Sequence, residues 1–169
     1  MGDWSELVLH RYNCSISIFE PVPAFAEKLR VRFKDSDRVV VHEFGIGRLG
    51  GKRYFQVSGD GTGAFAGGQP SQVAFRPALE LVLDSPEVVS LMAVNIEGGE
   101  YELIPALDEA NLLARIQVIF IQFHKVGEDW EQERKNCQKV LSKTHSLDWD
   151  YPFVWEKWSS MSSSRISNV

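Results

Sequence analysis

Apolar side chains recur along this chain with two different periods, and these periods predict alternating helices and strands. Apolar residues three and four positions apart, the spacing of one helix face, predict helices at residues 4–11, 22–33, 75–83, 100–107 and 128–141. Short apolar runs rich in β-branched residues predict strands at residues 14–19, 39–44, 54–57, 88–96 and 116–123, and an aromatic-rich segment at 147–158 predicts a last strand or hairpin. This alternation favours an α/β domain whose mainly parallel sheet is covered by helices on both faces.

Capping residues and prolines set the expected limits of these helices. Asp3 or Ser5 can cap the first helix, because their side-chain oxygens accept hydrogen bonds from free backbone N–H groups. Pro21 or Pro23 suits the start of the second helix, where the missing N–H of proline costs nothing. Pro105 is expected to kink or shorten the helix at 100–107.

Residues 58–70 (SGDGTGAFAGGQP) are expected to form the most flexible stretch inside the chain. A mobile lid, a wide hairpin and a phosphate loop are the three interpretations. A phosphate loop needs Lys and Ser or Thr at the end of its glycine run, and these are absent, so we expect a surface or lid loop. The Ser-rich segment 159–169 is expected to be disordered, which leaves residues 1–158 as one domain.

Composition narrows the class of protein. The chain has 169 residues, of which 44% are hydrophobic, enough for one domain with a single core. The net charge of -5 and the lack of a clustered basic face argue against a nucleic-acid partner. The longest apolar run, residues 116–123, is too short to span a bilayer, and no signal-peptide pattern is seen, so we expect a cytoplasmic protein without a membrane partner. Cys14 and Cys137 are expected to be reduced thiols.

Candidate chemistry lies just after the strands, because open α/β sheets bind ligands at the carboxyl ends of their strands. Glu20 follows the first strand, and a carboxylate there can accept hydrogen bonds from both hydroxyls of a ribose. It can equally cap the helix that follows it. Both interpretations of Glu20 stay open at this point.

Two further strand ends carry polar residues. Asn95 and Glu97 follow the strand at 88–96, and Gly98 and Gly99 let the backbone approach a ligand there or form a tight turn into the helix. His124 follows the strand at 116–123 and is either a general base for a hydroxyl or a polar residue satisfied at a strand end. The spacing of these residues matches no metal motif, so no metal site is expected.

Several segments resemble FkbM-type S-adenosylmethionine-dependent methyltransferases over nearly the whole chain. Ala93-Val94-Asn95-Ile96-Glu97-Gly98-Gly99-Glu100 resembles the strand-end motif of that family, usually Lys, Asp or Asn, then Glu-Gly-x-Glu. The other similar segments are Phe19-Glu20-Pro21, Ile121-Gln122-Phe123-His124, Thr144-His145, Tyr151-Pro152-Phe153-Val154-Trp155-Glu156 and the opening Gly2-Asp3-Trp4-Ser5. The last of these looks like the end of the family's first glycine motif, Asp-x-Gly-Ala-Asn-x-Gly.

The resemblance implies a Rossmann-like class I methyltransferase domain that binds S-adenosylmethionine and methylates a hydroxyl oxygen, for example on a saccharide or small metabolite. It implies that Glu20 holds the ribose, that Gly2 lies beside the methionine part, and that Glu43 lies near the adenine. It implies that Asn95 lines the reaction centre and that Glu97 or His124 removes the hydroxyl proton.

The chain departs from the family pattern in two places. Ala93 stands where the family has lysine, and the first strand and most of the first glycine motif are absent. In the family the absent strand is central, between the strands at 14–19 and 88–96. We therefore expect these two strands to pair directly, to take up a strand from a second copy in a homo-oligomer, or to leave the chain prone to aggregate.

Two rival functions remain. One is a truncated, non-catalytic methyltransferase-like domain with a binding or assembly role. The other is a protein that binds a different nucleotide cofactor such as NAD, against which the lack of a Gly-x-Gly-x-x-Gly run after a strand counts.

Overall fold

The computed structural model describes residues 2–58, 61–63, 69–81 and 87–162. The chain divides into two compact units. The N-terminal unit comprises Met1–Ile46 and Gly50–Arg76, and the C-terminal unit comprises Gly47–Leu49 and Pro77–Val169. The expectation of one domain over residues 1–158 stays a prediction.

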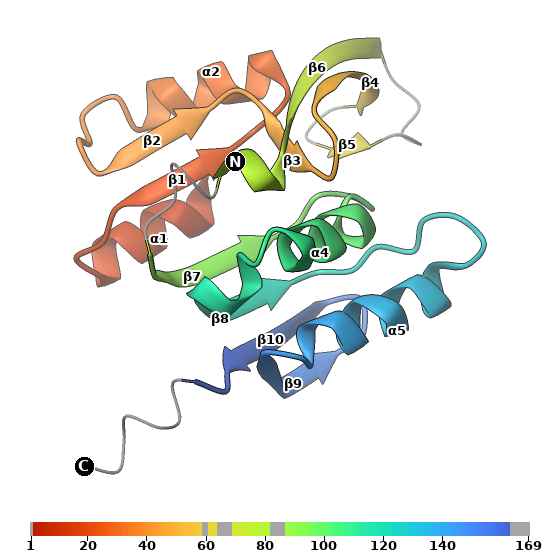
Figure 1. The fold of residues 1–169 in the computed structure, drawn as a ribbon. Helices are drawn as coiled ribbons and strands as arrows, with labels where there is room; N and C mark the ends of the chain where they lie inside the picture. Colours follow the sequence, from red (N-terminus) through yellow and green to blue (C-terminus); the bar gives the residue numbers. More distant parts are fainter. Residues whose placement is uncertain (1, 59–60, 64–68, 82–86, 163–169) are drawn as a thin grey trace. The chain divides into compact units, whose positions relative to one another are not determined.

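The first half of the N-terminal unit alternates helices and strands as predicted (Figure 1). Its elements are α1 (Asp3–Arg11), β1 (Ile16–Phe19), α2 (Pro23–Arg32) and β2 (Val39–His42). β1 and β2 pair in parallel, with Ile16 opposite Val39. Pro23 starts α2, whose buried face carries Phe25 and Leu29. The predicted caps of α1 are absent, because Gly2 is the N-cap and no side chain caps that helix.

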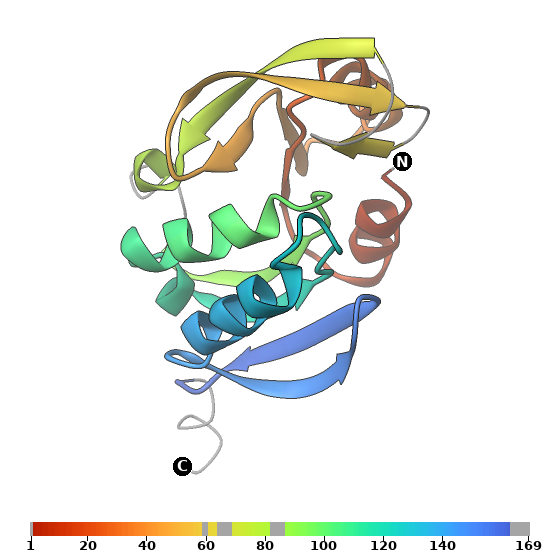
Figure 2. The ribbon, with the colours of Figure 1, turned by 90° about the vertical axis from the view of Figure 1, so that its right-hand side faces the viewer.

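The second half of this unit is an antiparallel sheet with the strand order β3-β6-β4-β5. Its strands are β3 (Gly45–Gly47), β4 (Gly51–Ser58), β5 (Gly61–Gly63) and β6 (Gln69–Pro77). β4 and β6 form a long pair, with Gly51 opposite Phe75 and Val57 opposite Gln69 (Figure 2). Of the glycine-rich segment 58–70, the described residues lie in these strands, which agrees with the hairpin interpretation, while residues 59–60 and 64–68 lie outside the described part.

The helix predicted at residues 75–83 is wrong over its first part. Residues 75–77 end strand β6, and Ala78–Glu80 form a single 3-10 turn, η1; residues 82–86 lie outside the described part of the chain. Phe75 stacks on Phe55 across the β4–β6 pair at a ring-centroid distance of 5.6 Å. In addition, Pro77 disfavours helical backbone at the residue before it. Cross-strand pairing therefore outweighs the helical spacing of these apolar residues.

The C-terminal unit has one four-stranded sheet with the order β7-β8-β10-β9. Its elements are β7 (Val89–Val94), α4 (Glu100–Glu109), the 3-10 turn η2 (Leu113–Arg115), β8 (Ile116–Ile121), α5 (Trp130–Leu141), β9 (His145–Tyr151) and β10 (Trp155–Ser160). β7 and β8 are parallel, whereas β10 runs antiparallel to β8 and to β9. Helices α4 and α5 lie side by side on one face of this sheet (Figures 1 and 2).

The core of the C-terminal unit is apolar and tightly covered. Ile104 from α4, Ile119 and Ile121 from β8, and Leu141 from α5 are each 0% exposed. Burial of each such side chain stabilises the fold by about 1.5–3 kcal/mol. This packing also explains why Pro105 does not shorten α4, which continues to Glu109. The cost of an interior proline, about 3 kcal/mol, is offset by the buried residues around it.

The structure confirms an α/β fold but changes two details of the prediction. The sheets are mixed rather than mainly parallel, because the C-terminal strands return as a hairpin and β3–β6 form a separate antiparallel sheet. Ser159 and Ser160, expected in a disordered tail, are the last residues of β10; residues 163–169 lie outside the described part. None of the described helices is long and apolar enough to cross a membrane.

The strands that were expected to flank a missing one belong to different sheets. β1 pairs with β2 in a two-stranded sheet, and β7 is the edge strand of the four-stranded sheet, next to β8. The described residues therefore do not show the direct pairing of β1 with β7 that was one of three expectations. The other two expectations, that a strand from a second copy fills the slot or that the chain is prone to aggregate, stay predictions.

Candidate functional site

The six residues singled out from the sequence are divided between the two units. Gly2, Glu20 and Glu43 lie in the N-terminal unit. Asn95, Glu97 and His124 lie in the C-terminal unit, all three just after parallel neighbouring strands. Within the C-terminal group, the side chains of Glu97 and His124 contact each other.

The turn between β7 and α4 brings Glu97 to the carboxyl end of the sheet. Glu97 has a positive φ of 51° and Gly98 a φ of 102°, so the chain reverses sharply here. A Cβ at Gly98 would lie 3.1 Å from Val126, in the segment after β8. A side chain at position 98 would therefore be strained and crowded, and glycine lets the two strand ends lie close together.

His124 lies against this turn. Because β7 and β8 are parallel, their carboxyl ends meet, and Gln122 continues the pairing by donating its N–H to the carbonyl of Val94. The Nε2 atom of His124 lies 3.5 Å from Oε1 of Glu97. The structure thus places the two residues predicted to carry the chemistry beside each other. Asn95 is exposed at the same strand end.

Glu100 is the residue that the sequence analysis did not single out as a site residue. It is the first residue of α4 and is 0% exposed, and one of its oxygens forms a very short hydrogen bond with Nδ1 of His124. Its other oxygen, Oε2, is buried without a hydrogen-bond partner among the described residues. The signal was present in the motif Glu97-Gly98-Gly99-Glu100, where helical spacing after the turn carries the second acid inward.

The electrostatics of this cluster favour a charged imidazole. The hydrogen bond that His124 donates to Glu100 raises the pKa of His124 above its ordinary value, and burial opposes this effect without cancelling it; the charges of Glu100 and Glu97 add to the rise.

Neighbouring groups of the cluster stay neutral. Burial raises the pKa of Tyr101 to about 12, helped by the charge of Glu100, and the Tyr101 hydroxyl donates a hydrogen bond of 2.5 Å to the carbonyl of His124. Burial likewise raises the pKa of Cys137 to about 12, so its thiol is a poor nucleophile. The proton chemistry of the cluster therefore belongs to Glu97, Glu100 and His124.

In the N-terminal unit, Glu20 follows β1 and is partly buried. Its Oε1 accepts a hydrogen bond of 2.9 Å from the N–H of Val22, the N-cap residue of α2. Burial raises the pKa of Glu20, and this hydrogen bond lowers it by a smaller amount. The contact shows that Glu20 supports the helix start, which was one of the two interpretations; the ribose contact stays a prediction.

An aromatic group lies at the same strand ends. Phe19 stacks on His42 at a ring-centroid distance of 4.7 Å, and Phe44 packs against both rings. Glu43, between the last two, accepts a hydrogen bond of 2.8 Å from Arg30. Gly2 has a φ of 85°, and a Cβ there would lie about 3.1–3.2 Å from side chains of α2 and the residue after it.

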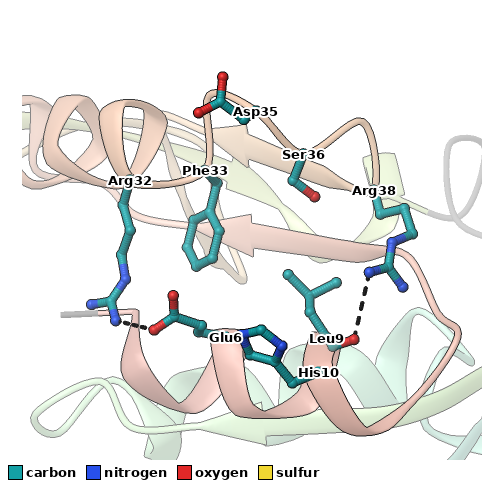
Figure 3. A pocket seen from close by; sticks show the side chains of 8 residues that line it. All are labelled: Glu6, Leu9, His10, Arg32, Phe33, Asp35, Ser36 and Arg38. Atoms are coloured by element: carbon teal, nitrogen blue, oxygen red, sulfur yellow. Dashed lines mark hydrogen bonds and ion pairs between the residues drawn. The ribbon is translucent and has the colours of Figure 1, made fainter.

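A hollow of about 240 Å³ lies elsewhere in the N-terminal unit, between α1 and the segment after α2 (Figure 3). Its two guanidinium groups are engaged within the protein. Arg32 donates to Glu6, and Arg38 donates to the carbonyls of Leu9 and Tyr12 at the end of α1. The side chains around the hollow thus bind α1 to the segment at and after the end of α2. Among the described residues, no cluster of three histidine, cysteine or acidic side chains could hold a metal ion.

Comparisons with known proteins give one informative likeness. No family model matches the chain, and no curated protein matches it significantly. The fold is similar to the crystal structure of methyltransferase FkbM from Methylobacillus flagellatus KT, with a TM-score of 0.53 and 15% sequence identity. The likeness covers 86% of this chain but 36% of that protein, so the chain spans about a third of its length. The chain has a methyltransferase-like fold.

Proposed function

We propose that this chain carries out S-adenosylmethionine-dependent methyl transfer of the FkbM type, to a hydroxyl oxygen of a saccharide or other small metabolite. The observation that carries the proposal is the methyltransferase-like fold together with a base cluster at the end of β7 and β8. The resemblance of the segment around Glu97 to the strand-end motif of the FkbM family supports the proposal, because it implies that Asn95 and Glu97 line the reaction centre.

The residues at the ends of β1 and β2 fit the nucleoside part of this cofactor. Glu20 is a partly buried carboxylate whose pKa is raised by burial. Two ribose hydroxyls donating to it would offset the cost of burying its charge. Phe19, His42 and Phe44 offer flat aromatic faces of the kind on which an adenine stacks. When bound, the cofactor supplies an electrophilic methyl group on a sulfonium centre.

The acceptor side depends on proton removal by this chain. A hydroxyl oxygen becomes a good nucleophile only as its proton leaves, and a histidine beside a carboxylate is suited to take that proton. His124 provides the base, and Glu97 lies on its outer side, 48% exposed, where an acceptor can reach it. Alignment of the acceptor oxygen would supply much of the remaining rate enhancement.

Calorimetric titration with S-adenosylhomocysteine tests the cofactor half of the proposal. Glu20→Gln should weaken binding about tenfold or more, as expected when a charge-assisted hydrogen bond is lost. Glu27→Gln is the matched control, because Glu27 is an exposed acid of the adjoining helix α2. Absence of binding to the unaltered chain, or equal affinity of all three proteins, would contradict the proposal.

A second assay tests methyl transfer itself. Release of S-adenosylhomocysteine is followed with a panel of saccharides and small hydroxylated metabolites as acceptors. His124→Gln should abolish turnover while leaving cofactor affinity unchanged, because its role is on the acceptor side. Binding without turnover on any acceptor would favour the non-catalytic alternative.

A further inference from the structure

Three ionisable side chains in the C-terminal unit form a line from the core to the surface. The side chain of Glu100 is 0% exposed, that of His124 is 16% exposed and that of Glu97 is 48% exposed. Glu100 contacts Nδ1 of the imidazole and Glu97 faces Nε2. The two ring nitrogens of His124 therefore have different surroundings, one sealed inside the protein and one near solvent.

Glu100, the buried member of the three, determines which ring nitrogen of His124 keeps its proton. Ionised Glu100 can only accept hydrogen bonds, so Nδ1 of His124 must carry a proton in their contact. Because Oε2 of Glu100 has no hydrogen-bond partner among the described residues, the histidine is the main compensation for this buried charge. Loss of a proton from His124 must then occur at Nε2, on the exposed side.

We propose that Glu100 is a positioning residue that holds Nδ1–H of His124, selects Nε2 as the proton-exchanging atom, and so sets the pH range in which the site can deprotonate an acceptor. In that step the O–H bond of the acceptor breaks, its electron pair stays on oxygen, and a new N–H bond forms at Nε2. Glu97, on the same side, lies where it can pass this proton to water. The catalytic consequence rests on the proposed methyltransferase function, whereas the protonation of His124 does not.

The surroundings determine the direction of the pH effect. The charged groups that act on His124 are Glu100 and Glu97. Tyr101, Glu133, Arg134 and Cys137, on helices α4 and α5, interact with one another and with Glu100. Tyr101 and Cys137 stay neutral, so the two nearest acids dominate. His124 therefore keeps its proton to higher pH than an ordinary histidine, whose pKa is about 6.5, and acts as a base only in that higher range.

NMR titration of the histidine ring signals in the full chain tests this inference without cofactor or acceptor. The chain has four histidines, and His124→Gln identifies the signal of His124 by its disappearance. We expect that signal to titrate above pH 6.5, and its ¹⁵N shifts to show the last proton leaving from Nε2. Glu100→Gln, which keeps a hydrogen-bond acceptor but removes the charge, should move the midpoint down by about one pH unit or more.

Glu109→Gln is the matched control, because it removes one acid from the last turn of the same helix, where Glu109 pairs with Arg48. It should leave the His124 midpoint unchanged. If Glu100→Gln fails to fold, the unaltered chain still decides the question. A midpoint at or below about 6.5 in that chain, or loss of the proton from Nδ1, overturns the inference. Unchanged titration in a folded Glu100→Gln protein overturns it as well.

A pH profile of turnover separates this inference from the proposed function. If the chain is active, the acidic limb of its profile should follow the His124 midpoint and move with it in Glu100→Gln. A confirmed titration in a protein that transfers no methyl group would refute the proposed function and leave the proton-holding role of Glu100 standing. If the protein is active but the acidic limb of its pH profile does not move in Glu100→Gln, the role of Glu100 in catalysis is refuted.

Discussion

The two units of the molecule differ in how deeply their ion pairs are buried. The C-terminal unit has surface pairs, but it also contains a buried one: Glu156 is 1% exposed and accepts hydrogen bonds from Arg134, Gln138 and Trp158. In the N-terminal unit the ion pairs lie at the surface, as in the contacts of Arg32 with Asp3 and Glu6. Its buried cluster of Val22, Phe25 and Val73 is entirely apolar.

Buried charges and apolar packing differ in how strictly they fix the positions of neighbouring groups. A buried charge tolerates only one arrangement of its partners, because each lost hydrogen bond leaves a costly desolvated group. Apolar packing tolerates many arrangements of similar volume. The C-terminal unit is therefore better suited to hold the fixed geometry of proton chemistry, which is where Glu97, Glu100 and His124 lie. The N-terminal unit is better suited to adapt around a ligand.

Removal of the buried carboxylate should have the largest effect on stability. Glu156→Ala leaves the Trp158 N–H and the Gln138 amide without their acceptor and Arg134 with Asp150 alone, which should cost about 3–5 kcal/mol of unfolding free energy. Denaturation followed by tryptophan fluorescence measures it. Asp148→Ala, on the neighbouring strand β9, is the control and should cost much less, since its contacts with Lys157 and Ser159 are near the surface. Equal losses would contradict the view that burial makes the contacts of Glu156 more important than those of Asp148.

Removal of apolar volume should weaken the N-terminal unit by a similar or smaller amount. Leu29→Ala shortens a side chain on the buried face of α2 that is 3% exposed. Such changes lower the free energy of unfolding by about 2–5 kcal/mol. Hydrogen exchange of α2 and β2 is the measurement. Val31→Ala, at a position 60% exposed on the same helix, should leave exchange unchanged. If the two variants behave alike, the apolar packing of this unit is not what holds it.

The pH dependence of stability should reveal a second buried histidine in the C-terminal unit. Burial lowers the pKa of His145, whose Nε2–H donates to the carbonyl of Ile116 at 2.9 Å. Its neutral form fits the fold, so stability is full above the unfolded pKa of about 6.5 and falls as the pH drops below it. His145→Gln should flatten this acid decline in unfolding experiments between pH 7 and 5. A decline of unchanged steepness would exclude His145 as its source.

The opposite sign is expected for His124. Its folded pKa lies above the unfolded value, so its pairing with Glu100 stabilises the fold fully below about pH 6.5. This contribution is lost as the pH rises through the folded pKa. His124→Gln should therefore remove a decline in stability on the alkaline side, measured by urea unfolding from pH 6 to 9. A variant with the same alkaline slope as the unaltered chain would argue against a charged His124.

The smallest effect is expected at the surface of the N-terminal unit. Arg32→Gln breaks ion pairs with Asp3 and Glu6, but solvent screens such pairs strongly. The melting temperature should stay within experimental error, and only hydrogen exchange near the start of α1 should speed up. Cooperative unfolding of the whole unit would show that these surface contacts matter more than its apolar packing.

The sequence by itself determined the elements whose signals are local. Pro23 starts α2, β-branched residues form β2, and the acid-first, base-last helix α5 lies where its pattern predicts. The strand ends that carry Glu97 and His124 were also predictable, because apolar runs stop there. These features depend on backbone preferences and burial of nearby residues, which a single sequence displays.

Only the tertiary structure decided the features that need a distant partner. Residues 75–77 join β6 because β4 pairs with them, although their own spacing is helical. Pro105 stays inside α4 because the packing of that helix outweighs its cost. Glu100 becomes part of the site because His124, 24 residues later, approaches it across the ends of two parallel strands. The pKa of His124 is raised by its hydrogen bond to the buried Glu100, and that effect exists only once the chain has brought the two side chains together.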